Sequence, residues 1–326
     1  MSFLDLKVAT AARETELIRR LVLEPVSGAL PAFEPGASIT LHIPGVGRRR
    51  YSLVNADPAA HGTPPKHYEL AVRLEAEGGG GSRWVHRLNP GDVVRAEAPL
   101  NEFALAAGSH PVLLLAGGIG VTPLIAKAAA MKAQGRPFRF VYAARRREDF
   151  AYLPVLRALA GDDLVLHADD EAGRVLDVPA LLDSLPAGTE VHVCGPKPML
   201  AAAVDTARVL GWPEGLLCFE RFYSLGEVDD APAAMAGDGS FEVEIASTGQ
   251  VITVPADKTI VAAMLDAGFD PLCDCMRGEC GVCQTTVLEG VPDHRDSILS
   301  DSERAAGKLI QICISRAKSP RLKLDL

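Results

Sequence analysis

The stretch that decides the fold of the middle of this chain is LLLAGGIGVTPL, at residues 113–124. An apolar run is followed by Gly117, Gly118 and Gly120, and then by Thr122 and a proline that suit the first turn of a helix. A buried strand, a glycine turn and a helix in this order indicate a parallel sheet, with the positive end of the helix directed at a phosphate group. A tight strand-to-helix turn requires glycine even without a ligand, so this stretch alone leaves ligand binding open.

The same texture continues over residues 110–217, where apolar strands alternate with alanine-rich helices. The expected strands are PVLLLAGG, FRFVYAAR, LVLHADD and EVHVCG, and the expected helices are TPLIAKAAAMKAQG, LPVLRALA and PMLAAAVDTARVLG. This alternation predicts four strands in a doubly wound α/β sheet, in which ligands bind at the carboxyl ends of the strands. CGPKPML at 194–200 places a second Gly-Pro turn at that edge and strengthens the case for a ligand.

Residues 5–107 have a different texture, with short alternating segments such as SITLHI and DVVRAEAP broken by glycine and proline. They predict an antiparallel barrel or sandwich. In RRRYSLVNADP, Arg49, Tyr51 and Ser52 stand at the end of an expected strand, where an arginine, a ring and a hydroxyl suit a flat redox ring. GGGGSRWVHRL at 78–88 suits an anion, although a flexible hairpin loop has the same composition.

The C-terminal part begins with GEVDDAPAAMAGDGS, whose small, acidic and turn-forming residues predict a flexible linker at 226–240. FEVEIASTGQVITVPA then predicts a hairpin that turns near Thr248 and Gly249, and KTIVAAMLDAG predicts a short helix ended by Gly268. The third domain is therefore expected to be a small sheet-plus-helix unit that holds the stretch CMRGECGVC at 275–283.

That stretch begins a spaced set of thiols, which consists of Cys275, Cys280, Cys283 and Cys313. The odd total of seven cysteines does not suit a disulfide framework, and zinc ribbons use two short Cys pairs. The C-x4-C-x2-C…C spacing is the plant-type [2Fe-2S] pattern. Gly278 and Gly281 permit backbone amides to hydrogen-bond the cluster sulfurs, and Cys273 is interpreted as a spare buried thiol. The spacing predicts one-electron chemistry.

Composition narrows the remaining classes of function. The chain has 326 residues, 48% of them hydrophobic and 23% charged, which fits two or three globular domains. A net charge of -9 argues against broad attraction to nucleic acid or anionic lipid. Because there is no apolar run of about 18 residues and the first residues include Asp5, Glu14 and Glu16, we expect neither a membrane span nor a signal peptide, and a cytoplasmic location.

Taken together, the motifs resemble the phthalate dioxygenase reductase family, which includes vanillate demethylase reductases and other partners of Rieske oxygenases. The shared motifs are R-x-Y-S at 49–52, G-G-I-G-V-T-P at 117–123, C-G-P-x-x-M at 194–199, FERF at 219–222 and the terminal cysteine pattern. The resemblance covers essentially the whole chain. It implies electron transfer from NADH through FMN and a [2Fe-2S] cluster to a Rieske non-haem iron oxygenase that performs aromatic-ring dioxygenation or O-demethylation.

The resemblance also implies a domain plan and a set of site residues. The plan is an FMN-binding antiparallel β-barrel at 1–107, an NAD-binding α/β domain at 108–225, the linker, and an α+β ferredoxin domain of the β-grasp type at 241–326. For the flavin, the implied residues are Arg49, Tyr51, Ser52, Leu53, Gly80, Gly81 and Ser82. For the nicotinamide cofactor the implied residues are Gly118, Thr122, Cys194, Gly195 and Pro196. The glycine turn adds Gly117 and Gly120, and the acidic pair after the third strand adds Asp169. Phe222, Thr122 and Cys194 would border the place of hydride transfer, and the four spaced cysteines would bind the cluster.

Two cofactor choices and two rival functions stay open at this point. AARRRED after the second strand favours a 2'-phosphate, whereas Asp169 and Asp170 suit a free ribose hydroxyl; the resemblance implies NADH. The resemblance likewise implies FMN and not FAD, which is supported only by the lack of an evident second adenosine-binding segment in the first domain. The rivals are a non-enzymatic ferredoxin-type electron carrier with a docking scaffold, and a zinc-stabilised interaction protein. We expect a monomer that forms a transient complex with its oxygenase.

Overall fold

The structure is a computed structural model that describes residues 3–76, 80–105, 108, 110–213, 215–220, 222, 239–269, 271, 278, 283–296 and 298–326. The chain divides into two compact units, Met1–Phe222 and Tyr223–Leu326, and each is described by itself. Among the described helices, none has the length and apolar character needed to cross a membrane. Of the predicted linker at 226–240, residues 226–238 lie outside the described residues.

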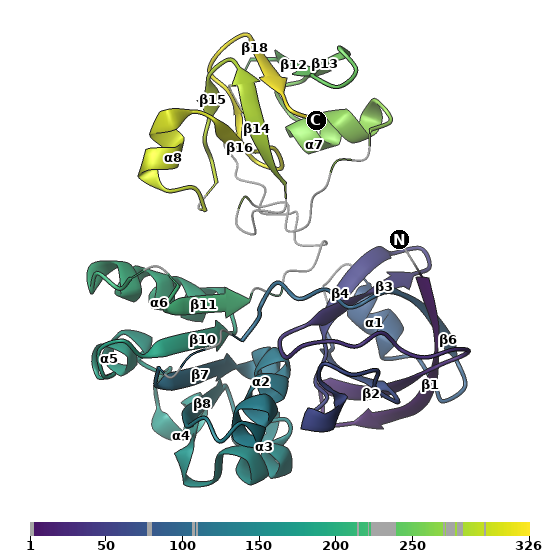
Figure 1. Ribbon diagram of the computed structural model, residues 1–326, viewed down its shortest axis with the longest axis vertical. Coiled ribbons are helices and arrows are strands. Elements are labelled where there is room, and N and C mark those ends of the chain that lie inside the picture. Colours follow the sequence, from purple (N-terminus) through teal and green to yellow (C-terminus); the bar gives the residue numbers. More distant parts are fainter. Residues whose placement is uncertain are drawn as a thin grey trace. The chain divides into compact units, whose positions relative to one another are not determined.

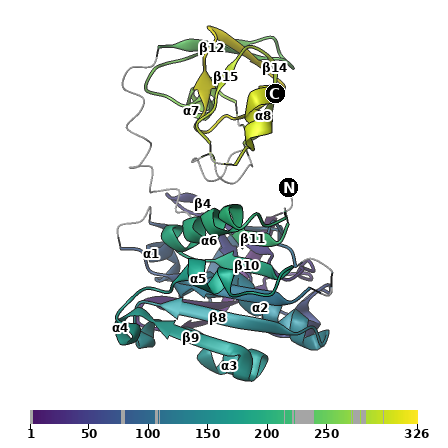
Figure 2. The ribbon, with the colours of Figure 1, turned by 90° about the vertical axis from the view of Figure 1, so that its left-hand side faces the viewer.

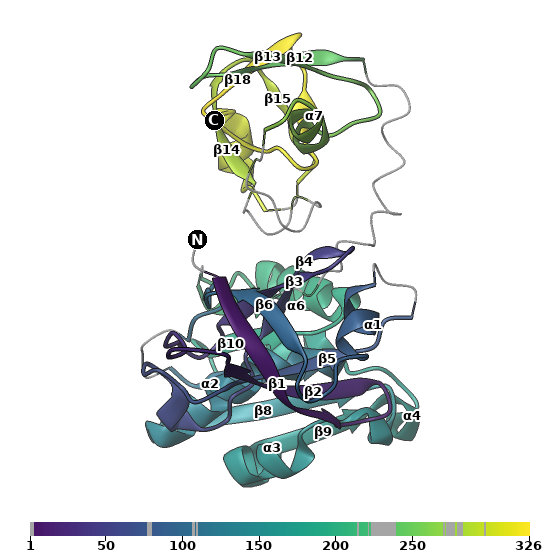
Figure 3. The same cartoon turned by 90° about the vertical axis from the view of Figure 1, so that its right-hand side faces the viewer.

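The first unit begins with a six-stranded antiparallel barrel (Figure 3). Its strands are β1 (Phe3–Arg13), β2 (Ile18–Pro25), β3 (Ser38–Ile43), β4 (Gly47–Ser52), β5 (Tyr68–Arg73) and β6 (Val93–Glu97), in the order β4-β3-β6-β1-β2-β5. Just after β4, the amide of Val54 donates to the carbonyl of Glu69 on β5 at 2.9 Å, which joins the two ends of the sheet. Inward-facing residues such as Leu41 and Leu70 are fully buried in its core. The structure therefore has the barrel and not the sandwich.

A five-stranded parallel sheet follows the barrel (Figures 1 and 2). Its strands are β7 (Val112–Gly117), β8 (Phe138–Ala144), β9 (Leu164–Ala168), β10 (Glu190–Cys194) and β11 (Leu217–Glu220), in the order β11-β10-β7-β8-β9. Helices α2 (Val121–Ala133) and α3 (Leu153–Ala160) cover one face, and α5 (Val178–Asp183) and α6 (Lys197–Val209) cover the other. The order reverses between β7 and β10, where ligands of such sheets bind.

The prediction of four strands in this sheet is wrong by one. Strand β11 has only four residues, and Cys218 and Glu220 interrupt its apolar pattern. Since no helix follows it among the described residues, the alternation of strands and helices gives no signal for it. The shorter elements of the unit are α1 (Gly81–Val85), α4 (Asp169–Ala172) and the 3-10 turns at Pro58–Ala60, Gly118–Gly120, Arg147–Asp149 and Gly161–Asp163.

The barrel and the parallel sheet pack against each other through a shared apolar core. Val54 and Phe103 of the barrel lie in the same buried cluster as Leu114 of β7 and residues of α2. Polar contacts add to this interface: the hydroxyl of Tyr152 donates to Glu69 at 3.0 Å. The two sheets of the first unit are thus held together by burial as well as by hydrogen bonds.

A polar network is buried between β10 and α2. Lys127 Nζ lies 2.7 Å from His192 Nδ1, His192 Nε2 lies 2.6 Å from Glu190 Oε1, and Arg136 donates to Glu190 Oε2 at 2.8 Å. Burial and the neighbouring Lys127 lower the pKa of His192 to about 4, so a neutral ring accepts from lysine and donates to glutamate. With Cys218, Glu190 and His192 form a set whose ligand atoms lie within 4.8 Å. Arg136 supplies positive charge to Glu190, and both ring nitrogens of His192 already have hydrogen-bond partners, so we interpret the set as structural and not as a metal site.

The second unit is a mixed sheet crossed by short helices. Its elements are β12 (Phe241–Ile245), β13 (Val251–Val254), α7 (Ile260–Asp266), β14 (Gln284–Glu289), β15 (Pro292–Asp293), α8 (Asp301–Ala306), β16 (Leu309–Gln311), β17 (Arg316–Ala317) and β18 (Arg321–Leu324). The main sheet has the order β13-β12-β18-β14-β16, with β12 and β18 parallel. The predicted hairpin is β12–β13, with Gly249 at φ +70°, and the predicted helix is α7, which Thr259 caps.

Candidate functional site

The carboxyl ends of β7 and β10 meet through glycines at the edge of the parallel sheet. A Cβ on Gly120 would lie 2.2 Å from the carbonyl oxygen of Cys194, and one on Gly117 would lie 2.5 Å from Pro196 Cδ. A Cβ on Gly195 would lie 2.7 Å from the sulfur of Met199. Gly120 and Gly117 are therefore needed for the two turns to pack together, whereas a side chain at Gly195 would first displace Met199. Close packing is the structural alternative that the sequence left open.

Gly118 differs from its neighbours, because its φ is +54° and a Cβ there would meet nothing within 4 Å. It is the glycine of this turn that faces open space. Thr122 is buried, and its hydroxyl donates to the carbonyl of Ile119 at 3.0 Å, inside the turn. Cys194 is fully buried at the end of β10, and burial holds the pKa of its thiol well above the usual range. The predicted nicotinamide residues thus lie at one edge, but Thr122 and Cys194 direct their polar atoms into the protein.

One hydrogen bond connects this edge to the barrel. The hydroxyl of Ser52, at the end of β4, donates to Glu220 Oε2, at the end of β11, at 3.2 Å. The two residues are 168 positions apart. The end of a barrel strand, where the flavin residues were predicted, therefore lies beside the carboxyl ends of the parallel strands, where the nicotinamide residues were predicted.

Glu220 is a site residue that the sequence analysis missed. Burial raises the pKa of its carboxyl to about 7, while the bond from Ser52 and the charges of Lys127 and Arg50 partly oppose the rise. A carboxyl with this pKa at a candidate site is able to hold a proton near neutral pH. The sequence signal was an acidic residue ending an apolar strand, within the FERF motif whose Phe222 alone was selected.

The other predicted flavin residues lie on and after β4. Arg49 packs against α1, because a Cβ on Gly81 would come within 2.9 Å of its Cγ. Burial raises the pKa of Tyr51 to about 12, although Arg49 lowers it. Leu53 is fully buried in the barrel core and its amide donates to Ala37, so its side chain is not available to a ligand. Arg49 and Tyr51 remain at the rim.

The predicted phosphate cradle lies at the start of α1, and residues 78 and 79 of its glycine run lie outside the described residues. Gly80 has a φ of +88°, which only glycine adopts without strain, and it caps the helix. The amide of Glu75 donates to the hydroxyl of Ser82 at 3.0 Å, so that hydroxyl fixes the loop. Close contact between Gly81 and Arg49 brings a cation to this helix start.

The charged residues that bear on the choice of nucleotide lie at the ends of β8 and β9. The amide of Asp170 donates to the carbonyl of Arg145 at 3.1 Å, so the arginine run and the acidic pair are adjacent. Arg146 pairs with Asp149 at 3.0 Å, and Arg147 pairs with Glu171 at 3.2 Å. These carboxylates therefore neutralise the positive charge of two of the three arginines.

Three further residues of the predicted nicotinamide and hydride-transfer site lie in the first unit, on or next to α4, α6 and β11. Asp169 begins α4, where its carboxylate lies 3.3 Å from His167 Nε2. Pro196 precedes α6 and packs over Gly117. Phe222 follows β11 with 39% of its surface exposed. An exposed aromatic ring two residues after Glu220 provides a surface on which a flat ring can stack.

In the second unit, the structure describes two of the four predicted cluster cysteines. Cys283 precedes β14 and Cys313 follows β16, and both are buried. The predicted ligands Cys275 and Cys280, like Cys273 and Gly281, lie outside the described residues. Gly278 is described, and its amide donates to Cys313 Sγ at 3.2 Å. A buried thiol that receives a backbone N–H is the donor arrangement that an iron–sulfur cluster requires.

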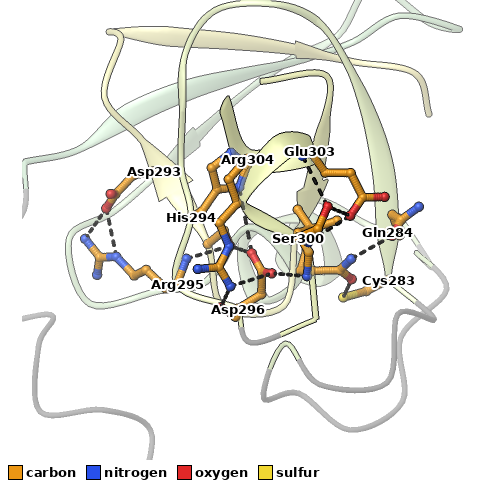
Figure 4. A network of polar contacts seen from close by, with 12 residues as sticks. Cys283, Gln284, Asp293, His294, Arg295, Asp296, Ser300, Glu303 and Arg304 are labelled. Atoms are coloured by element: carbon orange, nitrogen blue, oxygen red, sulfur yellow. Dashed lines mark hydrogen bonds and ion pairs between the residues drawn. The ribbon is translucent and has the colours of Figure 1, made fainter. Parts of the chain in front are cut away.

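Gly278 is held from two sides at this place. A Cβ on it would lie 2.4 Å from Ile314 and 2.8 Å from Asp296, and its φ is +68°. Asp296 belongs to a polar network whose labelled members surround it in Figure 4. Its carboxylate accepts from the amide of Leu299 at 3.0 Å and from the hydroxyl of Ser315 at 3.3 Å. The network fixes the segments next to Gly278 and Cys313.

Comparison with known proteins supports both the nucleotide site of the first unit and the cluster site of the second unit. Residues 114–205 match the model of the oxidoreductase NAD-binding domain, and residues 243–318 match that of the 2Fe-2S iron-sulfur cluster binding domain. A vanillate O-demethylase oxidoreductase from Pseudomonas sp. (strain HR199 / DSM 7063) is 39% identical over 302 residues, 92% of either chain.

Two solved structures extend the comparison. Phthalate dioxygenase reductase, described as modular for electron transfer from pyridine nucleotides to [2Fe-2S], is 32% identical with a TM-score of 0.70, over 100% of this chain and 98% of that one. An intact type IV self-sufficient cytochrome P450 monooxygenase is 34% identical with a TM-score of 0.79, over 99% of this chain. This chain spans 41% of that larger protein.

The fold, the site and these matches define a class: an NAD(P)H-dependent flavin and [2Fe-2S] oxidoreductase that is the reductase component of a multi-component oxygenase. Within that class, the chain belongs to the family of phthalate dioxygenase reductase and vanillate O-demethylase oxidoreductase. The resemblance inferred from the motifs is confirmed, as is the expectation of an antiparallel barrel, a parallel α/β sheet and a ferredoxin-like mixed sheet.

Proposed function

We propose that this protein takes electrons from NADH onto FMN and passes them through its [2Fe-2S] cluster to a Rieske non-haem iron oxygenase. The proposed division is barrel at 1–107, nucleotide domain at 108–225, linker at 226–240 and ferredoxin domain at 241–326. The observation that best supports the proposal is the Ser52–Glu220 hydrogen bond of 3.2 Å, because it joins the flavin and nicotinamide halves of one site.

The side chains of the first unit would bind and orient the two cofactors. Arg49 and the Gly80–Ser82 turn would hold the flavin phosphate, and Tyr51 and Ser52 would lie along its ring. Gly118 would admit the nicotinamide nucleotide at the edge of the sheet, and Phe222 would cover the ring. When bound, flavin accepts a hydride and returns its two electrons singly, which matches a one-electron cluster. No general base is assigned.

Ser52 and Glu220 would together hold or release a proton where the flavin and nicotinamide sites meet. With a carboxyl pKa of about 7, Glu220 is able to hold a proton on Oε2 or to accept a hydrogen bond from Ser52 Oγ near neutral pH. Ser52 is buried and Glu220 is partly buried, so the hydrogen bond lies in surroundings less polar than bulk water, which strengthens it. In the second unit, Cys275, Cys280, Cys283 and Cys313 would hold the cluster.

The choice of NADH over NADPH is supported by the charges after β8 and β9. Arg146 and Arg147 are paired with Asp149 and Glu171, so binding a 2'-phosphate would first have to break these ion pairs. Asp169 and Asp170 would repel that phosphate and suit a ribose hydroxyl. Comparing the rates of flavin reduction by the two nucleotides tests this choice, and faster reduction by NADPH would contradict it.

The Rieske partner is supported by the vanillate and phthalate relatives, and a haem partner is the second candidate because the same fold is part of a cytochrome P450 monooxygenase. Mixing the reduced protein with a purified Rieske oxygenase and with a separate P450 haem domain distinguishes the two. We expect rapid reoxidation by the Rieske protein alone. We also expect the protein to be cytoplasmic and monomeric. Light scattering measures its molar mass and so tests the monomer.

An anaerobic absorption spectrum tests the electron path. We expect flavin and iron–sulfur bands in the purified protein, FMN in the denatured extract, and bleaching of the flavin bands by NADH. An electron carrier would have cluster bands without flavin and would not oxidise NADH. A zinc-stabilised protein would be colourless. Either of these two spectra would overturn the proposal.

A further inference from the structure

Gln311 is a buried amide next to one of the cysteines of the plant-type pattern. It ends β16, its exposed fraction is 0%, and the strand register places it opposite Gln284 of β14. Its Oε1 lies 3.4 Å from Cys283 Sγ, and its Nε2 donates to Gln284 Oε1 at 3.0 Å. The side-chain amide of Gln311 therefore connects buried Cys283 to exposed Gln284 of the adjacent strand, and both of these partners are labelled in Figure 4.

This orientation of the amide suits a protonated thiol, whose S–H donates to the carbonyl. A cysteine bound to iron has no proton, so its sulfur only accepts hydrogen bonds. The oxygen and nitrogen of an amide fill nearly the same volume, so a half turn about the Cγ–Cδ bond exchanges them without moving their neighbours. The turned Gln311 directs its N–H at Cys283 Sγ and its carbonyl at Gln284, whose exposed amide is able to turn and donate.

We propose that Gln311 is a positioning residue for the cluster, which donates a hydrogen bond from Nε2 to the sulfur of Cys283 and thereby raises the reduction potential. The proposal rests on the assignment of Cys283 as a cluster ligand. Reduction adds negative charge that the sulfur ligands share, so a donor to sulfur stabilises the reduced form more than the oxidised form. Because Gln311 is fully buried, water cannot replace this donor.

Gln311 complements a second donor that comes from the backbone. The amide of Gly278 donates to Cys313 Sγ at 3.2 Å, and the turned amide of Gln311 would donate to Cys283 Sγ, so each described cysteine would have one donor. The backbone donor is insensitive to side-chain replacement, whereas the contribution of Gln311 can be removed by substitution. The turn from Gln311 to Ser315, which contains Cys313, keeps its own backbone bond of 3.0 Å.

The test is a redox titration of the full chain, followed by the EPR signal of the reduced cluster. Gln311→Met keeps the length of the side chain and removes the donor. Gln284→Met is the matched control, because it removes the second partner of the amide and leaves Cys283 untouched. We expect Gln311→Met to shift the one-electron equilibrium about tenfold toward the oxidised cluster, a fall of about 59 mV. The control should shift it less than twofold. An unchanged or raised potential in Gln311→Met would overturn the proposal.

A second measurement does not depend on that variant assembling its cluster. The chain has four glutamines, Gln134, Gln250, Gln284 and Gln311, so labelling glutamine side chains with nitrogen-15 marks few sites. Pulsed EPR of the reduced cluster should detect a labelled nitrogen in the wild type and equally in Gln284→Met. Absence of the coupling from both proteins would contradict the hydrogen bond. A wild type without any cluster would instead refute the proposed function, so the two failures are distinguishable.

Discussion

At the scale of single residues, the Ser52–Glu220 pair is the point at which two distant parts of the sequence meet. Glu220 is partly buried, where a charge is poorly solvated, and it accepts a hydrogen bond from the hydroxyl of Ser52 in the barrel. Holding a carboxyl of raised pKa costs folding free energy above that pKa. Carboxyls with strongly shifted pKa values are found mainly at functional sites, and we therefore place Glu220 in the site.

The first prediction concerns the pH dependence of stability in Glu220→Gln. The pKa of Glu220 is raised from its usual 4.5 to about 7, so between these values the folded chain binds more protons than the unfolded chain. The free energy of unfolding therefore falls as pH rises through this window. Glutamine does not titrate, so this fall is absent from the variant. Between pH 5 and pH 8 the free energy of unfolding of the variant should therefore rise by about 2 kcal/mol relative to that of the wild type, after allowance for partial exposure.

Urea unfolding followed by tryptophan fluorescence measures this difference, since Trp84 and Trp212 both belong to the first unit. His192 has the opposite dependence, because its pKa is lowered to about 4, but it is present in both proteins and cancels from the comparison. Parallel stability curves for wild type and variant would show that Glu220 is not the group of raised pKa.

At the scale of elements, the edge of the parallel sheet depends on how closely the turns after β7 and β10 approach. Gly120 faces the carbonyl of Cys194, and that carbonyl belongs to backbone that cannot rotate away. Gly118, two residues earlier in the same turn, faces open space. One glycine-rich turn therefore combines a packing role with a ligand-facing role, and the sequence alone did not separate them.

Gly120→Ala tests the packing role. The new Cβ would meet backbone at 2.2 Å, so we expect a loss of about 3 kcal/mol in the free energy of unfolding of the first unit, and weaker binding of NADH. Gly135→Ala is the control: its φ is +65° but nothing lies within 4 Å. It should lower the free energy of unfolding by only about 1 kcal/mol, the cost of placing a non-glycine residue in the left-handed backbone conformation. Equal losses in the two variants would contradict this account.

The buried network between β10 and α2 gives the second prediction at this scale. The Arg136–Glu190 pair is only 8% and 5% exposed, so Arg136→Met leaves a buried carboxylate short of one partner. We expect a loss of about 3 kcal/mol in urea unfolding. Arg147→Met breaks the Arg147–Glu171 pair, which is 64% and 52% exposed, and should cost less than about 1 kcal/mol. The reverse order would show that the buried network does not support the sheet.

At the scale of the whole molecule, the sequence predicts best what lies close together along the chain. The stretch at 113–124 predicts β7, its turn and α2, and the cysteine spacing predicts the ferredoxin unit. Contacts such as Ser52–Glu220 join residues 168 apart, and no local period marks them. Gln311 was missed for a related reason, because a single polar residue on a short strand acquires its meaning only from the register with β14.

The division into two units predicts that the redox centres can be separated by substitution. Cys280→Ser should abolish the cluster bands and EPR signal, while the rate of flavin reduction by NADH stays within about twofold, because the ligands belong to the second unit. Cys218→Ser, in β11 of the first unit, is the matched control and should keep both centres. If Cys280→Ser lost flavin reduction as well, the modular arrangement would be wrong.

The central claim is that electrons reach the iron–sulfur cluster only by way of the flavin. Rapid mixing of the anaerobic protein with one equivalent of NADH, followed by absorption and freeze-quenched EPR, tests it most directly. The account predicts that the flavin bands bleach first and that the EPR signal of the reduced cluster grows afterwards. A cluster signal that rises while the flavin bands stay unchanged, or bleached flavin that never reduces the cluster, would contradict it.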